Sequence, residues 1–256
     1  MPLSDDDVER YARHLVLREI GGVGQAKIRN AKVLIIGAGG LGSPLALYLA
    51  AAGVGTLGLV DDDVVALSNL QRQILFHTSD VGRKKTDAAK DALTALNPGV
   101  TVDMHAVRLT AANAAALIGA YDIIAEGSDN FETRFLVHDT CFALKKILVS
   151  AAVTEFDGQL ATWRGHEAGK PCYRCLFPAP PPGGVANCSE TGVLGAAAGV
   201  MGSLQALEVL KEITGAGESL AGRLLIYDAL AARFRTISVP PDPACPLCAG
   251  HKNPAG

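Results

Sequence analysis

Short apolar runs alternate with amphipathic stretches through the first 152 residues of the chain. Runs rich in Val, Ile and Leu predict five strands, over residues 31–36, 56–60, 100–107, 121–125 and 147–152. Between these runs, helical spacing of apolar residues predicts helices over residues 41–52, 82–96, 111–118 and 131–145. Strands that alternate with helices in this rhythm indicate parallel βαβ units with right-handed crossovers.

The pattern changes from Glu155 onward. Strands are expected over residues 160–163, 224–227 and 234–239, the last two antiparallel, and a Pro- and Gly-rich loop covers residues 178–184. An apolar stretch over residues 192–210 carries a single charge, Glu208, and several glycines. Because small residues let a helix pack closely against protein, we interpret this stretch as a buried or subunit-interface helix rather than a membrane span.

Together these patterns predict an α/β fold with a Rossmann-like parallel sheet, helices on both of its faces, and antiparallel strands added in the C-terminal half. No linker is polar enough to separate two domains, so we expect a single domain over residues 1–256. Within it, N-terminal helices are expected over residues 1–30, a nucleotide-binding βαβ half over 31–152, and a distinct C-terminal half over 153–256.

Composition narrows the class of protein. Hydrophobic residues make up 49% of the 256 residues and charged residues 19%, so the chain can bury a full core. The net charge of −3 gives no bulk attraction to nucleic acid or anionic membranes. Six cysteines are too few for a secreted disulfide framework, and the acidic N-terminus lacks the apolar segment of a signal peptide. These features predict a cytoplasmic enzyme.

A glycine-rich motif marks a nucleotide site. Gly-Ala-Gly-Gly-Leu-Gly, over residues 37–42, follows a predicted strand and opens a predicted helix. Glycines there allow a tight turn and let phosphate approach the free N–H groups at the helix start. Asp61, at the end of the next strand, is placed to accept hydrogen bonds from ribose hydroxyls. The motif alone leaves the choice of nucleotide open, with a dinucleotide as the default.

The polar segment over residues 67–73 favours a triphosphate instead. Arg72 and the later Lys85 provide two cations, which suit a reaction at the α-phosphate because negative charge builds on the leaving pyrophosphate. Taken alone, both are more typical of solvated surface charges. Asp129 follows the fourth strand, where its carboxylate suits Mg²⁺ and equally suits the N-cap of the next helix. The two roles are compatible, and both remain open.

Four of the six cysteines form two Cys-x2-Cys pairs, Cys172 with Cys175 and Cys245 with Cys248. This spacing predicts one structural Zn²⁺ held by four thiolates, with no coordination position left for a substrate. A redox pair is disfavoured because neither pair is expected to follow a strand and open a helix. Cys188, after the proline-rich loop, is either a nucleophile or an inert thiol, and Cys141 is expected to pack as a small apolar residue.

Several separated motifs together resemble the MoeB/ThiF family, relatives of the ubiquitin-activating enzymes. The resemblance extends over nearly the whole chain and rests on these motifs: Arg-Tyr-Ala-Arg-His over residues 10–14, the glycine motif, Ser-Asn-Leu-Gln-Arg-Gln over residues 68–73, and the two cysteine pairs. It implies ATP- and Mg²⁺-dependent adenylation of the C-terminal glycine of a small ubiquitin-like sulfur carrier protein ending in Gly-Gly, with release of pyrophosphate. It also implies a homodimer and a sulfur donor that is a separate protein, and it places carrier binding and zinc in the C-terminal half.

The resemblance also implies roles for individual residues. The nucleotide would be bound by Gly37, Gly39, Gly40, Gly42, Asp61, Ser68, Asn69, Leu70, Gln71, Arg72, Lys85, Asp129 and Asn130. The residues implied in catalysis are Asp129, Arg72, Lys85, Cys188 and an Arg13 that reaches into the partner protomer's site. The favoured carrier is of the MoaD type, for molybdopterin. A ThiS-type carrier for thiamine, with Cys188 as acyl or sulfur acceptor, is the alternative.

Two other classes of protein are compatible with the sequence. One is an NAD-dependent oxidoreductase with a structural zinc, which Arg72 and Lys85 argue against because a dinucleotide site has no need of that cation pair. The other is a scaffold that binds a ubiquitin-like partner without turnover. A tRNA-modifying cyclase within the same family gains no support from the net charge.

Overall fold

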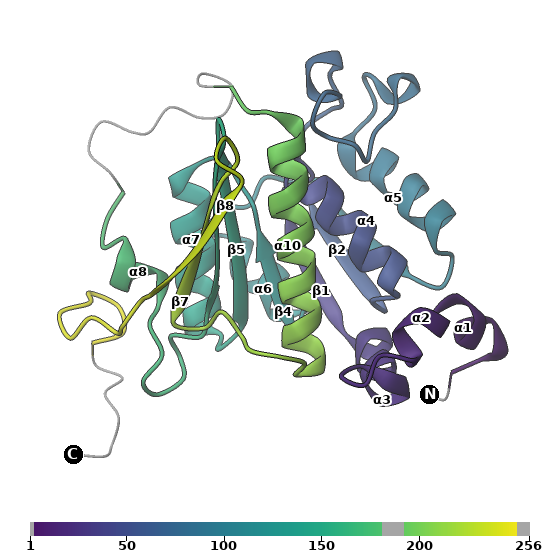
Figure 1. The fold of residues 1–256 in the computed structure, drawn as a ribbon. Coiled ribbons are helices and arrows are strands. Elements are labelled where there is room, and N and C mark those ends of the chain that lie inside the picture. Colours follow the sequence, from purple (N-terminus) through teal and green to yellow (C-terminus); the bar gives the residue numbers. More distant parts are fainter. Residues whose placement is uncertain (1–2, 181–191, 250–256) are drawn as a thin grey trace.

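An eight-stranded sheet in the order β3-β2-β1-β4-β5-β6-β7-β8 forms the centre of the computed structural model, which describes residues 3–180 and 192–249 (Figure 1). The first five strands pair in parallel and are β1 Lys32–Ile36, β2 Thr56–Val60, β3 Thr101–His105, β4 Ile123–Glu126 and β5 Ile147–Thr154. The antiparallel strands that continue the sheet are β6 Asp157–Trp163, β7 Arg223–Asp228 and β8 Arg233–Ser238. The predicted fold class is confirmed.

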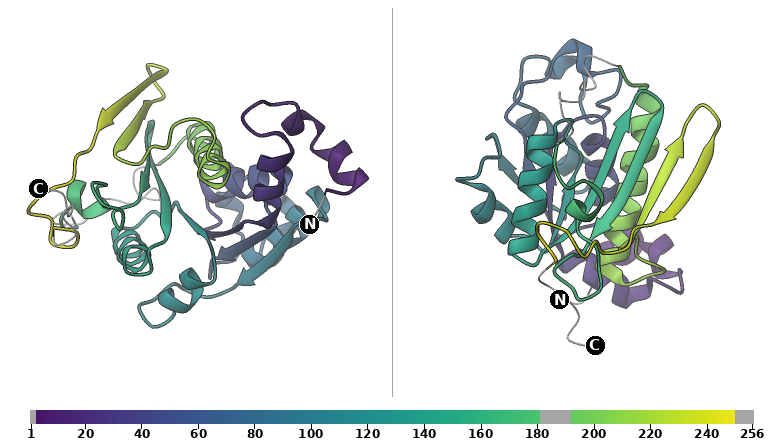
Figure 2. Two further views of the ribbon diagram at one scale, coloured as in Figure 1. Left: turned by 90° about the horizontal axis from the view of Figure 1, so that it is seen from below. Right: turned by 90° about the vertical axis from the view of Figure 1, so that its left-hand side faces the viewer.

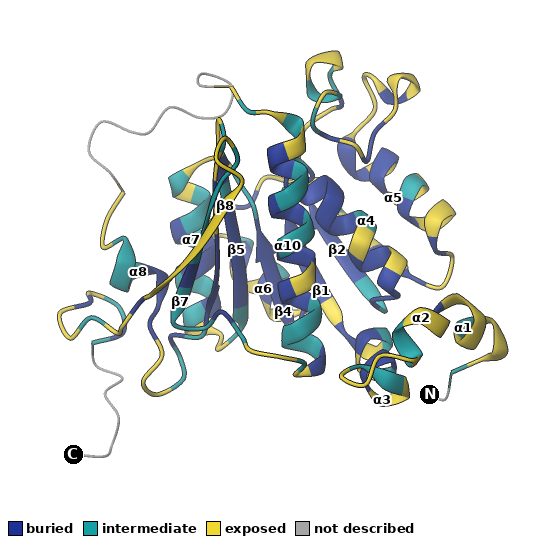
Figure 3. Cartoon of the chain, in the orientation of Figure 1, coloured by how far each residue is buried: buried dark blue, intermediate teal, exposed yellow. Residues whose placement is uncertain are grey.

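Helices cover both faces of the sheet (Figure 2). One face packs against α3 Gly21–Asn30, α4 Gly42–Ala52, α5 Lys85–Leu96 and α10 Gly195–Thr214. The other packs against α6 Ala114–Gly119 and α7 Phe131–Ala143. Three shorter helices are α1 Asp5–Arg10, α2 Ala12–Leu15 and α8 Tyr173–Leu176. Burial is deepest in the parallel strands between the two helical layers, whereas β8 is exposed along its whole length (Figure 3).

Several predicted boundaries are wrong by two to four residues, for local reasons. The helix predicted from residue 82 begins at Lys85, because Gly82 has a φ of +89° and the N-cap Lys84 is extended, with a ψ of 136°. The helix predicted to residue 145 ends at Ala143, just before Lys145 turns to a φ of +55°. The strand predicted over 100–107 is shortened to Thr101–His105. By contrast, the strand Thr56–Val60 is confirmed at both ends.

The apolar stretch after residue 192 forms the 20-residue helix α10, which ends at Gly215 in the left-handed conformation. It packs against α4, β5 and β6, so the prediction of a buried helix is confirmed. A Cβ on Gly202 would lie 2.4 Å from the carbonyl oxygen of Leu41, which shows how closely α10 approaches the start of α4. Within the described residues, no helix has both the length and the apolar character that crossing a membrane requires.

Candidate active site

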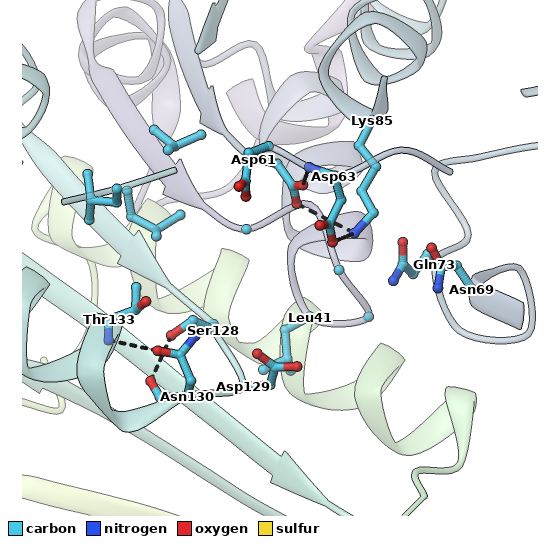
Figure 4. Close-up of a pocket in the computed structure, with 18 of the residues that line it drawn as sticks. Leu41, Asp61, Asp63, Asn69, Gln73, Lys85, Ser128, Asp129, Asn130 and Thr133 are labelled. Carbon is cyan, nitrogen blue, oxygen red and sulfur yellow. Dashed lines mark hydrogen bonds and ion pairs between the residues drawn. The ribbon is translucent and has the colours of Figure 1, made fainter. Parts of the chain in front are cut away.

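A cavity of about 390 Å³ opens at the carboxyl ends of β1, β2, β3 and β4 (Figure 4). Strand β1 lies between β2 and β4, so the chain leaves the sheet in opposite directions on its two sides. Ligands of open α/β sheets bind at this kind of switch point, because the loops that follow the two neighbouring strands diverge there. The cavity volume is in the range typical of small-molecule sites.

The glycine motif forms one wall of this cavity. Gly37, Gly39 and Gly40 line it, as predicted from the motif. Gly42 does not: a Cβ there would lie 1.9 Å from the carbonyl oxygen of Gly37, so its role is to let α4 start close to β1. The N–H of Ala38 donates a 2.8 Å hydrogen bond to Asp61, which ties the glycine loop to the end of β2.

Asp61 and Lys85 lie at the cavity together, although 24 positions separate them in the sequence. The Lys85 ammonium is 2.7 Å from the carboxylate of Asp63 and 3.8 Å from that of Asp61. Only 6% of the Lys85 side chain is exposed. Because a buried ammonium group needs an anionic partner, Lys85 is not the solvated surface charge that it resembles in isolation.

The polar segment after β2 contributes three side chains to the cavity: Asn69, Arg72 and Gln73. Ser68, Leu70 and Gln71, which the resemblance placed at the nucleotide, lie in the same turn but do not line the cavity. Ser68 instead accepts a 3.1 Å hydrogen bond from Arg72 through its carbonyl oxygen. Gln73 is buried, and its Oε1 has no hydrogen-bond partner among the described residues.

Sequence reasoning therefore missed Gln73, although it belongs to the polar segment that was singled out. Its neighbour Gln71 carries the same side chain and is exposed, and the pattern of residue types does not distinguish the two. Arg134, on α7, also lines the cavity and was not predicted, because its position inside a helix gave no signal.

The loop after β4 decides one of the two roles left open for Asp129, that of the N-cap. The N-cap of α7 is Asn130, whose Oδ1 accepts a 2.8 Å hydrogen bond from the N–H of Thr133. Asp129 is not the cap. Its carboxylate lines the cavity and has no hydrogen-bond partner in the described parts of the chain (Figure 4). It is therefore available to a ligand.

Two further residues implied in catalysis are Arg13 and Cys188. Arg13 is exposed on α2 and does not line the cavity of its own chain. Cys188 lies outside the described residues.

The four cysteines of the two Cys-x2-Cys pairs form one cluster, with every Sγ within 4.8 Å of the others. The sulfur of Cys172 is 3.5 Å from that of Cys245, and the sulfur of Cys175 is 3.3 Å from that of Cys248. Tetrahedral zinc with Zn–S bonds of about 2.3 Å places its sulfurs about 3.8 Å apart, so the residues fit a zinc ion. The four sulfurs fill its coordination shell, which suits a structural role.

Two other predictions concerned the cysteines: the argument against a redox pair and the packing of Cys141. Cys172 does open a helix, since it is the N-cap of the four-residue α8, but eight residues separate it from the end of β6, so it does not directly follow a strand. The convergence of all four thiols into one cluster supplies a better argument. Cys141 is 1% exposed within the second core, and burial raises the pKa of its thiol, so its predicted apolar packing is confirmed.

Helix α7 connects the cysteine cluster to the cavity. Near its C-terminal end, His138 accepts a 2.9 Å hydrogen bond from the N–H of Tyr173. Arg174 donates to both carboxylate oxygens of Asp139, at 2.8 and 2.7 Å. Burial opposes ionisation of Asp139, but the hydrogen bonds from Arg174 and His138 outweigh it and lower the pKa of Asp139 to about 2. The N-terminal end of the same helix carries the loop of Asp129.

His138 makes the stability of this region depend on pH. Burial lowers its pKa below 6.5, and Nε2 must be unprotonated to accept from Tyr173. The unfolded chain therefore takes up this proton first as the pH falls. We expect the free energy of unfolding to decrease below pH 6.5 by up to about 1.4 kcal/mol per pH unit from this residue. Denaturant titrations of wild type and His138→Gln between pH 7.5 and 5 measure the difference.

The control is His77→Gln, since His77 is exposed and lies outside this region, next to the short helical turn Thr78–Asp80. We expect its slope to stay closer to wild type. Equal slopes in wild type and His138→Gln would show that His138 does not control the acid sensitivity.

Comparisons with known proteins agree along most of the chain. The model of the ThiF family matches residues 11–247. A protein from Thermus thermophilus named sulfur carrier protein adenylyltransferase is 48% identical, over 97% of this chain and 93% of its own length. A protein from Mycobacterium tuberculosis named probable adenylyltransferase/sulfurtransferase MoeZ is also 48% identical, over 95% of this chain. The chain spans 63% of that longer relative.

Solved structures show the same fold. A crystal structure of Escherichia coli MccB with MccA-N7isoASN superposes with a TM-score of 0.84 and 23% identity, covering 96% of this chain and 75% of MccB. The crystal structure of PaaA gives a TM-score of 0.80 with 26% identity, over 93% of this chain and 75% of PaaA.

Proposed function

The chain belongs to the ThiF family, and from this premise we propose that its cavity uses ATP to adenylate the C-terminal glycine of a small ubiquitin-like sulfur carrier protein. The chain is thus an adenylyltransferase that acts on a sulfur carrier. One observation carries the proposal: the glycine loop, two cations and an unpaired carboxylate line the same cavity.

The reaction needs no general base, because the carrier's carboxylate is already ionised at neutral pH. Its oxygen attacks the α-phosphorus of ATP, the bond to the bridging oxygen breaks, and pyrophosphate leaves with the electron pair. Negative charge grows on that leaving group. Arg72 and Lys85 stabilise this charge, and the glycine loop holds the phosphates through its free N–H groups. The enzyme's contribution is therefore orientation and neutralisation of charge.

Asp129 is the residue that would hold Mg²⁺. The fit rests on an unpaired carboxylate that lines the same cavity as the glycine loop, a hard oxygen donor of the kind that Mg²⁺ shares with nucleotide phosphates. When bound, the metal would neutralise phosphate charge. The four-cysteine cluster would hold Zn²⁺ and connect the end of the described chain to α8.

Several finer assignments belong to the same proposal. The carrier is of the MoaD type, for molybdopterin, and ends in Gly-Gly; a ThiS-type carrier with Cys188 as acceptor is the alternative. The C-terminal half binds it, a separate protein donates sulfur, and the enzyme works in the cytoplasm.

The proposed enzyme is a homodimer in which Arg13 enters the partner's site. Exposed Tyr48 and Leu207 line a groove with His14, next to Arg13, and large apolar side chains exposed in this way favour burial against a second copy.

Pyrophosphate exchange into ATP tests the proposed function. We expect exchange only when a small carrier ending in Gly-Gly is present, because the carrier's carboxylate is the nucleophile. A panel of such carriers identifies the partner, and each carrier without its last glycine is the control. Carrier binding without exchange would indicate a scaffold. Thermal stabilisation by NADH and not by ATP would indicate the oxidoreductase.

A further inference from the structure

Glu126, the last residue of β4, is a buried carboxylate that the proposed mechanism does not use. Only 1% of its surface is exposed. One oxygen accepts hydrogen bonds from the N–H and the hydroxyl of Ser128, both at 2.5 Å. The other accepts a 2.9 Å hydrogen bond from Ser150, the residue paired with Glu126 across β4 and β5. A buried carboxylate is costly unless it is paired in this way, so its position is tightly defined.

Arg134 holds the same loop from the other side. Its guanidinium donates to the carbonyl oxygen of Ser128 from Nε at 3.1 Å and from a terminal nitrogen at 2.6 Å. The same Nε lies 4.0 Å from the Glu126 carboxylate. The N–H of Ser128 is therefore bound by Glu126 and its C=O by Arg134. Asp129 is the next residue.

The base of the loop is also fixed. Gln205, from α10, donates to the carbonyl oxygens of Glu126 at 2.9 Å and Val149 at 3.0 Å. A Cβ on Gly127 would lie 3.0 Å from the Cβ of Leu41, so the loop also packs closely against the start of α4. Asn130 caps α7 on the far side. Asp129 is thus the one side chain between these anchors that the described protein leaves unbound.

We propose that Glu126 and Arg134 are positioning residues that hold the Ser128 peptide so that the Asp129 carboxylate stays aimed into the cavity. The proposal rests on the proposed function, because it assigns these residues to the metal-binding carboxylate of that reaction. Glu126 acts in two ways: one oxygen accepts two hydrogen bonds from Ser128, and the carboxylate faces the Arg134 guanidinium. Neither residue needs to touch the substrate.

The chain offers a matched control in Glu208. This glutamate is also buried, at 2% exposed, and like Glu126 it accepts three hydrogen bonds: from the Thr162 hydroxyl, the Leu220 N–H and the Lys211 ammonium. It lies on α10 and does not line the cavity. Glu126→Ala and Glu208→Ala therefore remove equivalent hydrogen bonds, but only the first releases the Asp129 loop.

The first readout is the dependence of pyrophosphate exchange on ATP and Mg²⁺. We expect Glu126→Ala to lower kcat about 10- to 100-fold, with the Mg²⁺ concentration for half-maximal activity raised several-fold, because a displaced ligand loses its alignment. Glu126→Gln keeps an oxygen for Ser128 and should lose less than about fivefold of kcat. Glu208→Ala should stay within about twofold of wild type per folded molecule, in both kcat and Mg²⁺ dependence.

The second readout needs no carrier. Amide hydrogen exchange at Ser128 in the nucleotide-free protein should speed up about tenfold or more in Glu126→Ala and remain unchanged in Glu208→Ala. If no carrier supports exchange of pyrophosphate but amide exchange at Ser128 is still faster in Glu126→Ala, the proposed function is wrong. The role of Glu126 in holding the loop is then still supported. Unchanged Ser128 exchange, or an unchanged Mg²⁺ dependence in an active Glu126→Ala enzyme, would overturn the positioning role.

Discussion

Replacing Asp129 with Asn is expected to lower carrier-dependent pyrophosphate exchange about 100-fold or more, with little change in stability. The substitution removes the negative charge and keeps the shape of the side chain. Asp129 is exposed at the cavity and has no hydrogen-bond partner among the described residues, so the folded state loses no contact. The loss is expected because, in the proposed reaction, the metal-bound triphosphate no longer has its protein carboxylate ligand.

Exchange kinetics at several Mg²⁺ concentrations, together with calorimetric binding of ATP with and without Mg²⁺, measure this effect. We expect the variant to lose mainly the Mg²⁺-dependent part of ATP binding. Asp122→Asn is the control, because Asp122 lies at the opposite end of β4 and, among the described residues, accepts only the backbone N–H of Lys32. Near-wild-type exchange in Asp129→Asn would exclude the metal role of Asp129.

Replacing Cys245 with Ala is expected to remove bound zinc and lower the melting temperature by roughly 8–16 °C. The sulfurs of the four cysteines lie within 4.8 Å of one another, so the proposed zinc ion would connect α8 to the segment around Cys245 and Cys248. Loss of such a site costs several kcal/mol of stability, and about 4 kcal/mol corresponds to a shift of this size in a chain of this length.

Metal analysis of the reduced protein and thermal unfolding measure this second effect. Cys141→Ala is the matched control: Cys141 is buried but lies apart from the cluster, so we expect that variant to keep one zinc per chain and a melting temperature closer to wild type. Wild-type protein that binds well below one zinc per chain would contradict the site.

The strands and the glycine loop could be predicted because short-range sequence determines them. A run such as Thr56–Val60 has a strand's apolar pattern wherever the chain takes it, and the predicted bounds matched the structure. Helix ends were less predictable, since a single backbone angle, such as the φ of +89° at Gly82, moves the first turn by a few residues.

The roles of Asp129 and Asn130 could not be separated in advance. Asp and Asn are almost equally good N-caps, so residue preference does not decide between neighbours. The extended backbone of Asn130, with φ −131° and ψ 142°, gives it the cap and leaves the Asp129 carboxylate to the cavity.

The sequence by itself determined the alternating strands and helices, the phosphate-binding loop, and the cysteine pairs that predict zinc. These features depend on neighbours a few positions apart, which the chain carries into any fold. Only the tertiary structure decided that Lys85 lies between Asp61 and Asp63, that Gln73 and not Gln71 faces the cavity, and that four cysteines form one cluster. These contacts depend on how close strand ends and helices that are far apart in the sequence come to one another in the fold. Packing of the sheet against its two helical layers sets these distances.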